Sequence, residues 1–237
     1  MRKNGRTARK LKKLAWRFSQ PAWADNHGVL LPVKHALVSP GIAREIYLGD
    51  YESKEIEIIS NRVVPGDVVF EVGAGLGFLS AYCAKLTGAA KVFAYEANPE
   101  LIPVIRETHA KNDVAPTLIN ALLAQGDGER EFHLEDDFWA SSAHRTGGRA
   151  ITVKQLDLNS ELARVRPSFL IVDIEGGEAE FFAGADLSTV QKICVETHPD
   201  VLGDHVLSEM FAGLVAKGFA LDFSLIRKNV FFFHRPE

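Results

Sequence analysis

Three glycines at alternate positions, directly after an apolar run, constrain this chain most. The apolar run is Val68-Val69-Phe70, and it continues into Glu71-Val72-Gly73-Ala74-Gly75-Leu76-Gly77. The apolar residues predict a buried strand, and glycines after a strand let the backbone approach a ligand closely. A helix predicted from Phe78 to Leu86 adds unpaired N–H groups at its first turn. The segment therefore predicts a strand, a ligand-binding loop and a helix.

Predicted strands and helices alternate along most of the chain. This alternation implies right-handed crossovers and a parallel sheet. A hairpin around a loop at 135–149 interrupts the alternation, and a second hairpin at the end of the chain makes the last strand antiparallel. The predicted strands are 68–72, 91–96, 116–120, 130–134, 150–155, 169–173, 193–197, 219–223 and 230–233, and the predicted helices are 52–62, 78–86, 99–111 and 205–217.

The glycine spacing indicates which kind of nucleoside ligand fits the loop. A dinucleotide-binding loop needs its third glycine at position 78, where this chain has Phe78. The acid before the loop, Glu71, repels a pyrophosphate but suits an ammonium group. The loop therefore disfavours a dehydrogenase, although a tight strand-to-helix turn without a ligand would have a similar sequence.

A second acid follows at the end of the next predicted strand. Glu96 stands 19 residues after Gly77, where a carboxylate can accept hydrogen bonds from both hydroxyls of a ribose. The alternative role of such an acid is a helix cap. Together with Glu71, it describes a site for a positively charged ligand that carries a ribose. S-adenosylmethionine meets both requirements.

Polar residues also follow two later strands. Asp173 and Glu175 come after the apolar run 169–172, and His198 follows Glu196 by two residues. These positions lie at the carboxyl edge of a parallel sheet, where ligands bind. Asp173 would orient an acceptor or border a sulfonium, and Asp173 or His198 could remove a proton from an alcohol. Two alternatives remain: helix capping by the acids, and a magnesium-type ion held by this group together with Glu178.

Four segments together resemble the FkbM family of S-adenosylmethionine-dependent methyltransferases. They are Glu71 to Gly77, Tyr95-Glu96-Ala97-Asn98-Pro99, Val172-Asp173-Ile174-Glu175-Gly176-Gly177-Glu178 and Val195-Glu196-Thr197-His198-Pro199. Gly177 stands where the family usually has alanine. The resemblance implies a class I methyltransferase fold, an α/β Rossmann-like sheet of seven mostly parallel strands with an antiparallel last strand. It also implies methyl transfer to a hydroxyl of a small molecule, a sugar or a lipid-linked glycan.

The strand-end positions and the resemblance together assign roles to individual residues. Catalytic roles fall on Asp173, Glu175 and His198. Asn120 and Ala121 would flank the adenine, although Asn120 is equally suited to a turn. The residues expected to bind the cofactor are Glu71, Gly73, Ala74, Gly75, Gly77, Glu96, Ala97, Asn98, Asn120, Ala121 and Asp173.

Charge divides the chain into two parts. Residues 1–17 hold eight basic and no acidic side chains, which leaves 19 basic against 31 acidic residues in the rest, a net charge of −12. The basic segment would contact a membrane surface through residues 1–18, serve as a nucleic-acid arm or a transit peptide, or remain solvated. Pro21, Pro32 and Pro40 predict an irregular segment at 19–50. We expect residues 1–49 to be a basic segment and an irregular cover, and residues 50–237 to form the S-adenosylmethionine-dependent methyltransferase domain.

The same charges bear on partners and location. Acids at the expected mouth of the site would repel a phosphate backbone, so nucleic acid is expected to be an unlikely partner and a small molecule or glycan the acceptor. The aromatic and polar residues 135–145 are a candidate lid over that acceptor. No apolar run is long enough to span a membrane, and both cysteines lie in apolar segments, which favours the cytoplasm. A nucleic-acid methyltransferase and a non-catalytic nucleoside-binding module are the alternatives.

Overall fold

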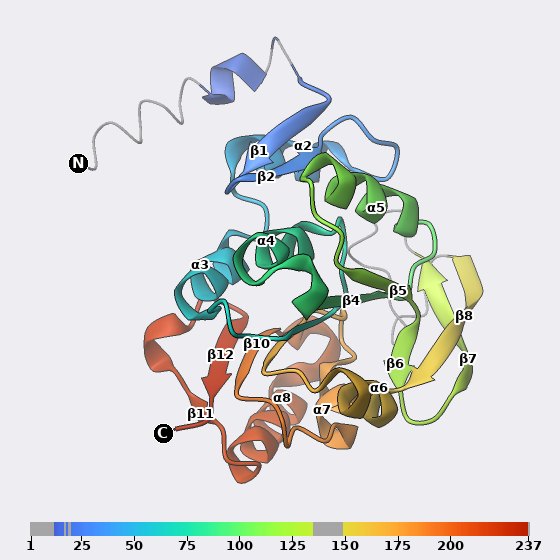
Figure 1. Ribbon diagram of the computed structural model, residues 1–237, viewed down its shortest axis with the longest axis vertical. Coiled ribbons are helices and arrows are strands. Elements are labelled where there is room, and N and C mark those ends of the chain that lie inside the picture. Colours follow the sequence, from blue (N-terminus) through green and yellow to red (C-terminus); the bar gives the residue numbers. More distant parts are fainter. Residues whose placement is uncertain (1–11, 17, 19, 135–148, 237) are drawn as a thin grey trace.

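A seven-stranded sheet forms the centre of the molecule (Figure 1). The computed structural model describes residues 12–16, 18, 20–134 and 149–236. The strand order is β11-β12-β10-β9-β3-β4-β5, and β12 runs antiparallel to both of its neighbours, whereas the other neighbouring pairs are parallel. The predicted parallel sheet with an antiparallel last strand is therefore confirmed. Its strands are β3 (Val69–Val72), β4 (Val92–Glu96), β5 (Thr117–Asn120), β9 (Phe169–Val172), β10 (Lys192–Glu196), β11 (Ala220–Leu221) and β12 (Val230–His234).

Helices cover both faces of this sheet and bury two hydrophobic cores. Val69 and Ile171 face the core under α2 to α5, whereas Phe70 and Leu170 face the core under α6 to α8. This follows from the period of two in a strand, which sends neighbouring side chains to opposite faces. The helices are α2 (Pro40–Leu48), α3 (Ser53–Arg62), α4 (Phe78–Thr87), α5 (Ile102–Lys111), α6 (Leu158–Val165), α7 (Glu178–Gly184) and α8 (Pro199–Ala216), and a 3₁₀ turn, η1, spans Ala89–Lys91.

The register of the parallel strands aligns the residues that follow them. Val72 of β3 pairs with Tyr95 of β4 and with Val172 of β9, which in turn pairs with Val195 of β10. The carboxyl ends of β3, β4, β9 and β10 therefore lie along one edge of the sheet. Ligands bind at this edge in open sheets of this kind.

The segment before the sheet is more regular than we expected from its prolines. The sequence predicted an irregular stretch at 19–50, but it forms a hairpin, β1 (Trp23–Asn26) with β2 (Val29–Pro32), and the helix α2. Ser39 caps α2, since its Oγ accepts the backbone N–H of Ile42 at 3.4 Å. The first strand, Trp23-Ala24-Asp25-Asn26, contains no apolar run that would mark it as a strand in the sequence. The hairpin lies beside α5 in Figure 1.

The last predicted strand pair is shorter than expected at its first strand. The sequence predicted a strand at 219–223, but β11 ends at Leu221. Asp222 accepts the backbone N–H of Ser224 at 2.9 Å and starts the 3₁₀ turn η3 (Phe223–Leu225), which ends the pairing.

No described helix is both long and apolar enough to cross a lipid bilayer.

A smaller sheet follows β5 in the chain. The predicted hairpin is confirmed, because β7 (Gly128–Leu134) pairs antiparallel with β8 (Arg149–Asp157). A strand that the sequence did not predict, β6 (Leu122–Ala124), adds to it in parallel with β8. This sheet lies beside the edge strand β5 in Figure 1, next to the carboxyl ends of the central strands.

Candidate active site

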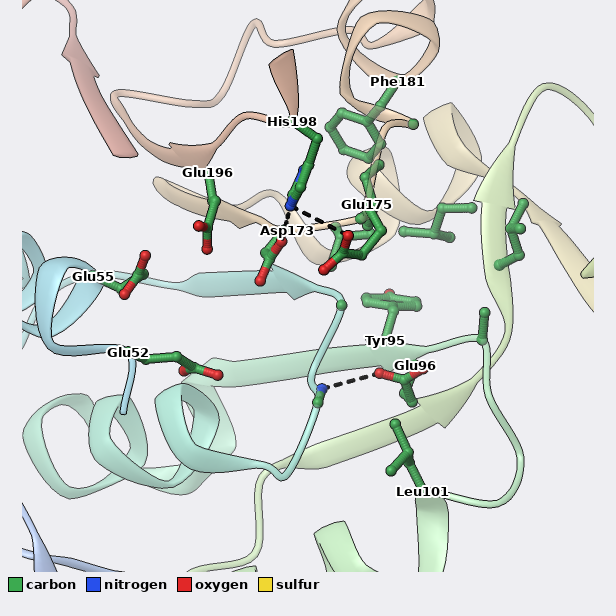
Figure 2. A pocket seen from close by; sticks show the side chains of 18 of the residues that line it. Glu52, Glu55, Tyr95, Glu96, Leu101, Asp173, Glu175, Phe181, Glu196 and His198 are labelled. Atoms are coloured by element: carbon green, nitrogen blue, oxygen red, sulfur yellow. Dashed lines mark hydrogen bonds and ion pairs between the residues drawn. The ribbon is translucent and has the colours of Figure 1, made fainter. Parts of the chain in front are cut away.

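A cavity of about 710 Å³ opens at the carboxyl edge of the central sheet. Figure 2 shows the acidic side chains that enter it, from the ends of β4, β9 and β10 and from the start of α3. Of the residues with predicted roles, the cavity is lined by Gly73, Gly75, Glu96, Ala97, Ala121, Asp173, Glu175 and His198.

The glycine loop forms one wall of the cavity and is held by close packing. Gly73, Gly75 and Gly77 all have positive φ angles, of 88°, 54° and 75°. A Cβ atom on Gly73 would lie 1.7 Å from the carbonyl oxygen of Asp173, and one on Gly77 would lie 2.8 Å from Ile105. Larger residues therefore fit neither the backbone angles nor the space. Because Gly73 and Gly77 lack a Cβ atom, the loop can pack closely against Asp173 and Ile105.

Glu96 joins the end of β4 to the glycine loop. Its Oε2 accepts the backbone N–H of Gly75 at 3.0 Å, and its Oε1 accepts that of Asn98 at 2.8 Å. Burial raises the pKa of Glu96 to about 7, against these backbone hydrogen bonds, which lower it. The carboxylate is thus fixed in direction and keeps lone pairs for hydroxyl groups of a ligand.

Glu71 lies behind the loop and is not one of the residues that line the cavity. Its side chain is 1% exposed, and burial raises its pKa to about 8 although contacts with Ser80 lower it. The hydroxyl of Ser80 also lies 3.0 Å from Nε2 of His109, a residue that the sequence did not single out. Burial lowers the pKa of His109 to about 4. Glu71, Ser80 and His109 thus form a connected group of buried polar side chains behind the glycine loop.

Two further predicted cofactor residues, Asn120 and Ala121, lie at the end of β5 and directly after it. Asn120 donates through Nδ2 to the carbonyl oxygens of Glu96 and Ala97, at 2.8 and 3.1 Å, so its amide closes the turn after β5. Ala121 follows and is buried in the cavity wall. The predicted residues that do not line the cavity are Glu71, Ala74, Gly77, Asn98 and Asn120.

Asp173, Glu175 and His198 come together as predicted from their strand ends. Nε2 of His198 lies 3.7 Å from Oδ1 of Asp173 and 3.5 Å from Oε2 of Glu175. Glu175 has a φ of 52°, and the next residue, Gly176, has a φ of 100°. This left-handed turn brings the Glu175 side chain back toward the cavity beside Asp173 (Figure 2).

The other ring nitrogen of His198 is held by a buried acid. Its Nδ1 lies 2.7 Å from Oε1 of Glu178, which also accepts the backbone N–H of Gly176 at 3.1 Å. Burial opposes the charging of His198, but the hydrogen bond to Glu178 and the charges of Asp173 and Glu175 outweigh it and raise its pKa to about 9. The surrounding carboxylates therefore favour the protonated form of His198.

Further acids in the cavity were not identified as site residues by sequence reasoning. Glu52 and Glu55 come from the start of α3, and Glu196 ends β10. Glu55 is 4% exposed, and its pKa is raised to about 7 by burial and by the charge of Glu196. Glu196 belongs to a recognised motif, but the position of Glu52 and Glu55 depends on how α3 crosses the sheet edge, which no local pattern encodes.

The predicted lid at 135–145 lies outside the described residues. On the flanking strand β7, Arg130 and Phe132 line the cavity. Arg130 makes two hydrogen bonds to Glu180 of α7, of 2.8 and 2.9 Å, which link the small sheet to the helix across the cavity mouth. Residues 1–11 of the basic segment also lie outside the described part.

Comparison with known proteins gives a family match over most of the residues that form the central sheet and the cavity. The sequence model of the methyltransferase FkbM domain matches residues 71–221. The methyltransferase from Pyrococcus furiosus has the same fold, with 13% identity, 98% of each chain covered and a TM-score of 0.51. The putative tRNA (m1A22) methyltransferase Sp1610 of Streptococcus pneumoniae, solved with S-adenosyl-L-methionine, is 11% identical over 78% of this chain and 73% of that chain, with a TM-score of 0.45.

A curated relative corrects one expectation. The chain is 40% identical over 67 residues to ribosomal RNA small subunit methyltransferase A of Thermotoga petrophila, a match that spans 28% of this chain and a quarter of that protein's length. This similarity contradicts the expectation that nucleic acid is an unlikely partner. The expectation considered only acids at the cavity mouth, whereas basic side chains elsewhere on a protein can supply contacts to a phosphate backbone.

Proposed function

Since this chain belongs to the methyltransferase FkbM domain family and is an S-adenosylmethionine-dependent methyltransferase, we propose that it transfers the methyl group to a hydroxyl oxygen of a small molecule, a sugar or a lipid-linked glycan. One observation carries the proposal. A single cavity has the glycine loop and Glu96 at one end and Asp173, Glu175 and His198 at the other. The first end suits a nucleoside, and the second suits an acceptor that must lose a proton.

The residues at the first end fit S-adenosylmethionine. Gly73 and Gly75 line the cavity without side chains that would fill it, and the carboxylate of Glu96 suits two ribose hydroxyls. Ala97 and Ala121 offer small apolar walls for the adenine. When bound, S-adenosylmethionine supplies a methyl group on a positively charged sulfur. We propose that Glu71, Ala74, Gly77, Asn98 and Asn120 support this end from behind the wall.

Proton removal at the second end falls to Asp173 in this proposal. An alcohol is a poor nucleophile until its proton leaves. Burial and the charge of Glu196 hold the pKa of Asp173 well above its usual range, which makes the carboxylate a stronger base. His198, with its pKa near 9, stabilises Asp173 and Glu175 by its charge and keeps them in place. A magnesium-type cation also stays a proposal for this end of the cavity.

We propose that residues 1–49 cover a catalytic domain formed by residues 50–237. Support comes from Ile42 and Glu45 of α2, which line the cavity. The cover would then help to exclude water during transfer. The cytoplasm stays our proposed location.

RNA is a second candidate acceptor, favoured by the similarity to a ribosomal RNA methyltransferase. The eight basic residues among the first 17 would serve as its phosphate-binding arm. A carboxylate such as Asp173 could take a proton from a ribose hydroxyl as well as from a hydroxyl of a small molecule, so its chemistry does not decide between the two acceptors.

A labelling experiment tests both candidates. The protein is incubated with methyl-labelled S-adenosylmethionine and with separate small-molecule, glycan and RNA fractions of cells. The proposal predicts label in a small molecule or glycan, bound as a methyl ether. Label that is confined to RNA and released by nuclease would support the second candidate and refute the first.

A further inference from the structure

Three donor atoms from two strand ends converge at the acceptor end of the cavity. One carboxylate oxygen from each of Asp173 and Glu175 and one ring nitrogen of His198 all lie within 4.8 Å of one another. The nitrogen lies 3.7 and 3.5 Å from the two oxygens. These distances exceed those of good hydrogen bonds. In octahedral coordination, two ligand atoms that each lie about 2.1 Å from a small divalent ion are about 3 Å apart when adjacent and about 4.2 Å apart when opposite. The two distances measured from the His198 nitrogen fall between these values.

His198 is oriented in the way that metal-binding imidazoles usually are. Its Nδ1 lies 2.7 Å from Oε1 of Glu178, whose side chain is fully buried, and its Nε2 is the nitrogen that faces Asp173 and Glu175. A carboxylate on the far ring nitrogen fixes the ring and raises the basicity of the nitrogen that binds the metal. Glu178 is thus a positioning residue for the donor set.

Two carboxylate oxygens without a hydrogen-bond partner give a second indication of a cation site. Oδ1 of Asp173 and Oε1 of Glu55 are buried atoms that have no hydrogen-bond partner among the described residues. Glu55 is only 4% exposed and lines the same cavity. In Figure 2 its carboxylate points toward Glu196 and Asp173. Buried carboxylates are costly unless a positive charge or a proton compensates them.

Three lysine and arginine side chains line this cavity, from Lys54, Arg130 and Lys228. Lys54 lies 3.6 Å from Glu196 and donates a hydrogen bond of 3.1 Å to Asn229. Arg130 pairs with Glu180 at the mouth. Neither has a contact with Asp173 among the described ion pairs. Among the described ion pairs, the basic partner of Asp173 is His198, at 3.7 Å, and a bound ion at the donor set would add positive charge there.

We propose that Asp173, Glu175 and His198 bind one divalent cation of the magnesium or manganese class. Carboxylate oxygens select these ions, and a single imidazole is compatible with manganese in particular. Glu178 orients His198, and Glu55 and Glu196 add negative charge around the ion. The inference deepens the proposed function, on which its catalytic meaning rests, because the ion would lie where the acceptor hydroxyl must be held. The second oxygen of Asp173 remains available for the acceptor's proton.

Manganese titration tests this site directly. The full-length protein, without S-adenosylmethionine, is titrated with Mn²⁺ while the electron paramagnetic resonance signal of the free ion is followed. We expect one saturable site per chain. Asp173→Asn and His198→Ala should each weaken binding by roughly 10-fold or more, and Glu178→Gln should weaken it by about 10-fold. Glu209→Gln is the matched control, since it removes one exposed carboxylate on α8, and binding should not change.

The outcomes separate this proposal from the proposed function. Absence of saturable Mn²⁺ binding, or equal binding by the wild type and Asp173→Asn, would overturn the metal site and leave His198 as the balancing charge. S-adenosylmethionine binding is measured on the same samples. A variant that loses Mn²⁺ but keeps S-adenosylmethionine is folded, so its loss supports the site. Failure of S-adenosylmethionine binding by the wild type would instead refute the proposed function.

Discussion

The carbonyl oxygen of Asp173 lies directly against Gly73, so that a Cβ atom added to Gly73 would approach it to 1.7 Å. The loop after β3 and the end of β9 are thus in backbone contact. This contact joins the proposed cofactor end of the cavity to the proposed acceptor end. It also explains why the loop needs glycine at that position, where φ is 88°.

Replacement of this glycine should damage both folding and binding. Gly73→Ala must relieve a backbone clash and adopt a positive φ, so we expect a loss of about 1–3 kcal/mol of unfolding free energy, measured by urea titration. S-adenosylmethionine binding should fall below detection by calorimetry. Gly66→Ala is the control, because an added Cβ there meets no atom within 4 Å. Normal binding by Gly73→Ala would show that the loop is not part of the cofactor site.

Glu71 should make stability depend on pH. Its folded-state pKa of about 8 lies above its ordinary value of 4.5, so the folded protein holds a proton that the unfolded chain releases. The stabilisation is complete below pH 4.5 and is lost as the pH rises through 8, on the order of 1 kcal/mol per pH unit.

Glu71→Gln removes this titration while it keeps the shape of the side chain. We expect the unfolding free energy of the wild type to fall between pH 5 and pH 8 relative to that of the variant, in urea titrations at both values. Parallel changes in the two proteins would contradict the assignment of a buried, protonated carboxyl to Glu71.

Asn112 should determine how firmly the first hairpin is attached. Its side chain bonds the backbone N–H and carbonyl of Leu30, both at 2.8 Å, and also accepts from Lys85 at 3.0 Å. Asn112→Ala removes the side-chain partner of both Leu30 groups, so we expect a loss of about 1–3 kcal/mol of unfolding free energy. The exposed Asn61→Ala serves as the comparison. An equal, small effect of both substitutions would mean that the hairpin is not held through Asn112.

Local patterns predicted the parts of the site that come from strand ends. Gly73, Glu96, Asp173 and His198 each follow an apolar run, and parallel strands bring their carboxyl ends to one edge. Their convergence was therefore accessible from the sequence.

Other parts depend on packing between distant segments. Glu55 is one of several acids in a polar helix, and nothing in its sequence shows that the helix lies across the cavity. The support of His198 by Glu178 depends on the turn at Glu175 and Gly176, where φ is positive. The burial of Glu71 behind the loop follows from the α/β packing around Ser80. Such relationships appear only once the helices are placed on the sheet.

The central claim is that the cavity has a cofactor end at Glu96 and an acceptor end at His198. Calorimetric titration of S-adenosylmethionine into the wild type, Glu96→Ala and His198→Ala tests it most directly. We predict clear binding by the wild type, binding weakened by roughly 10-fold or more in Glu96→Ala after the loss of charge-assisted hydrogen bonds, and unchanged binding in His198→Ala. Equal losses in the two variants, or wild-type binding of NAD in place of S-adenosylmethionine, would contradict the division of the cavity.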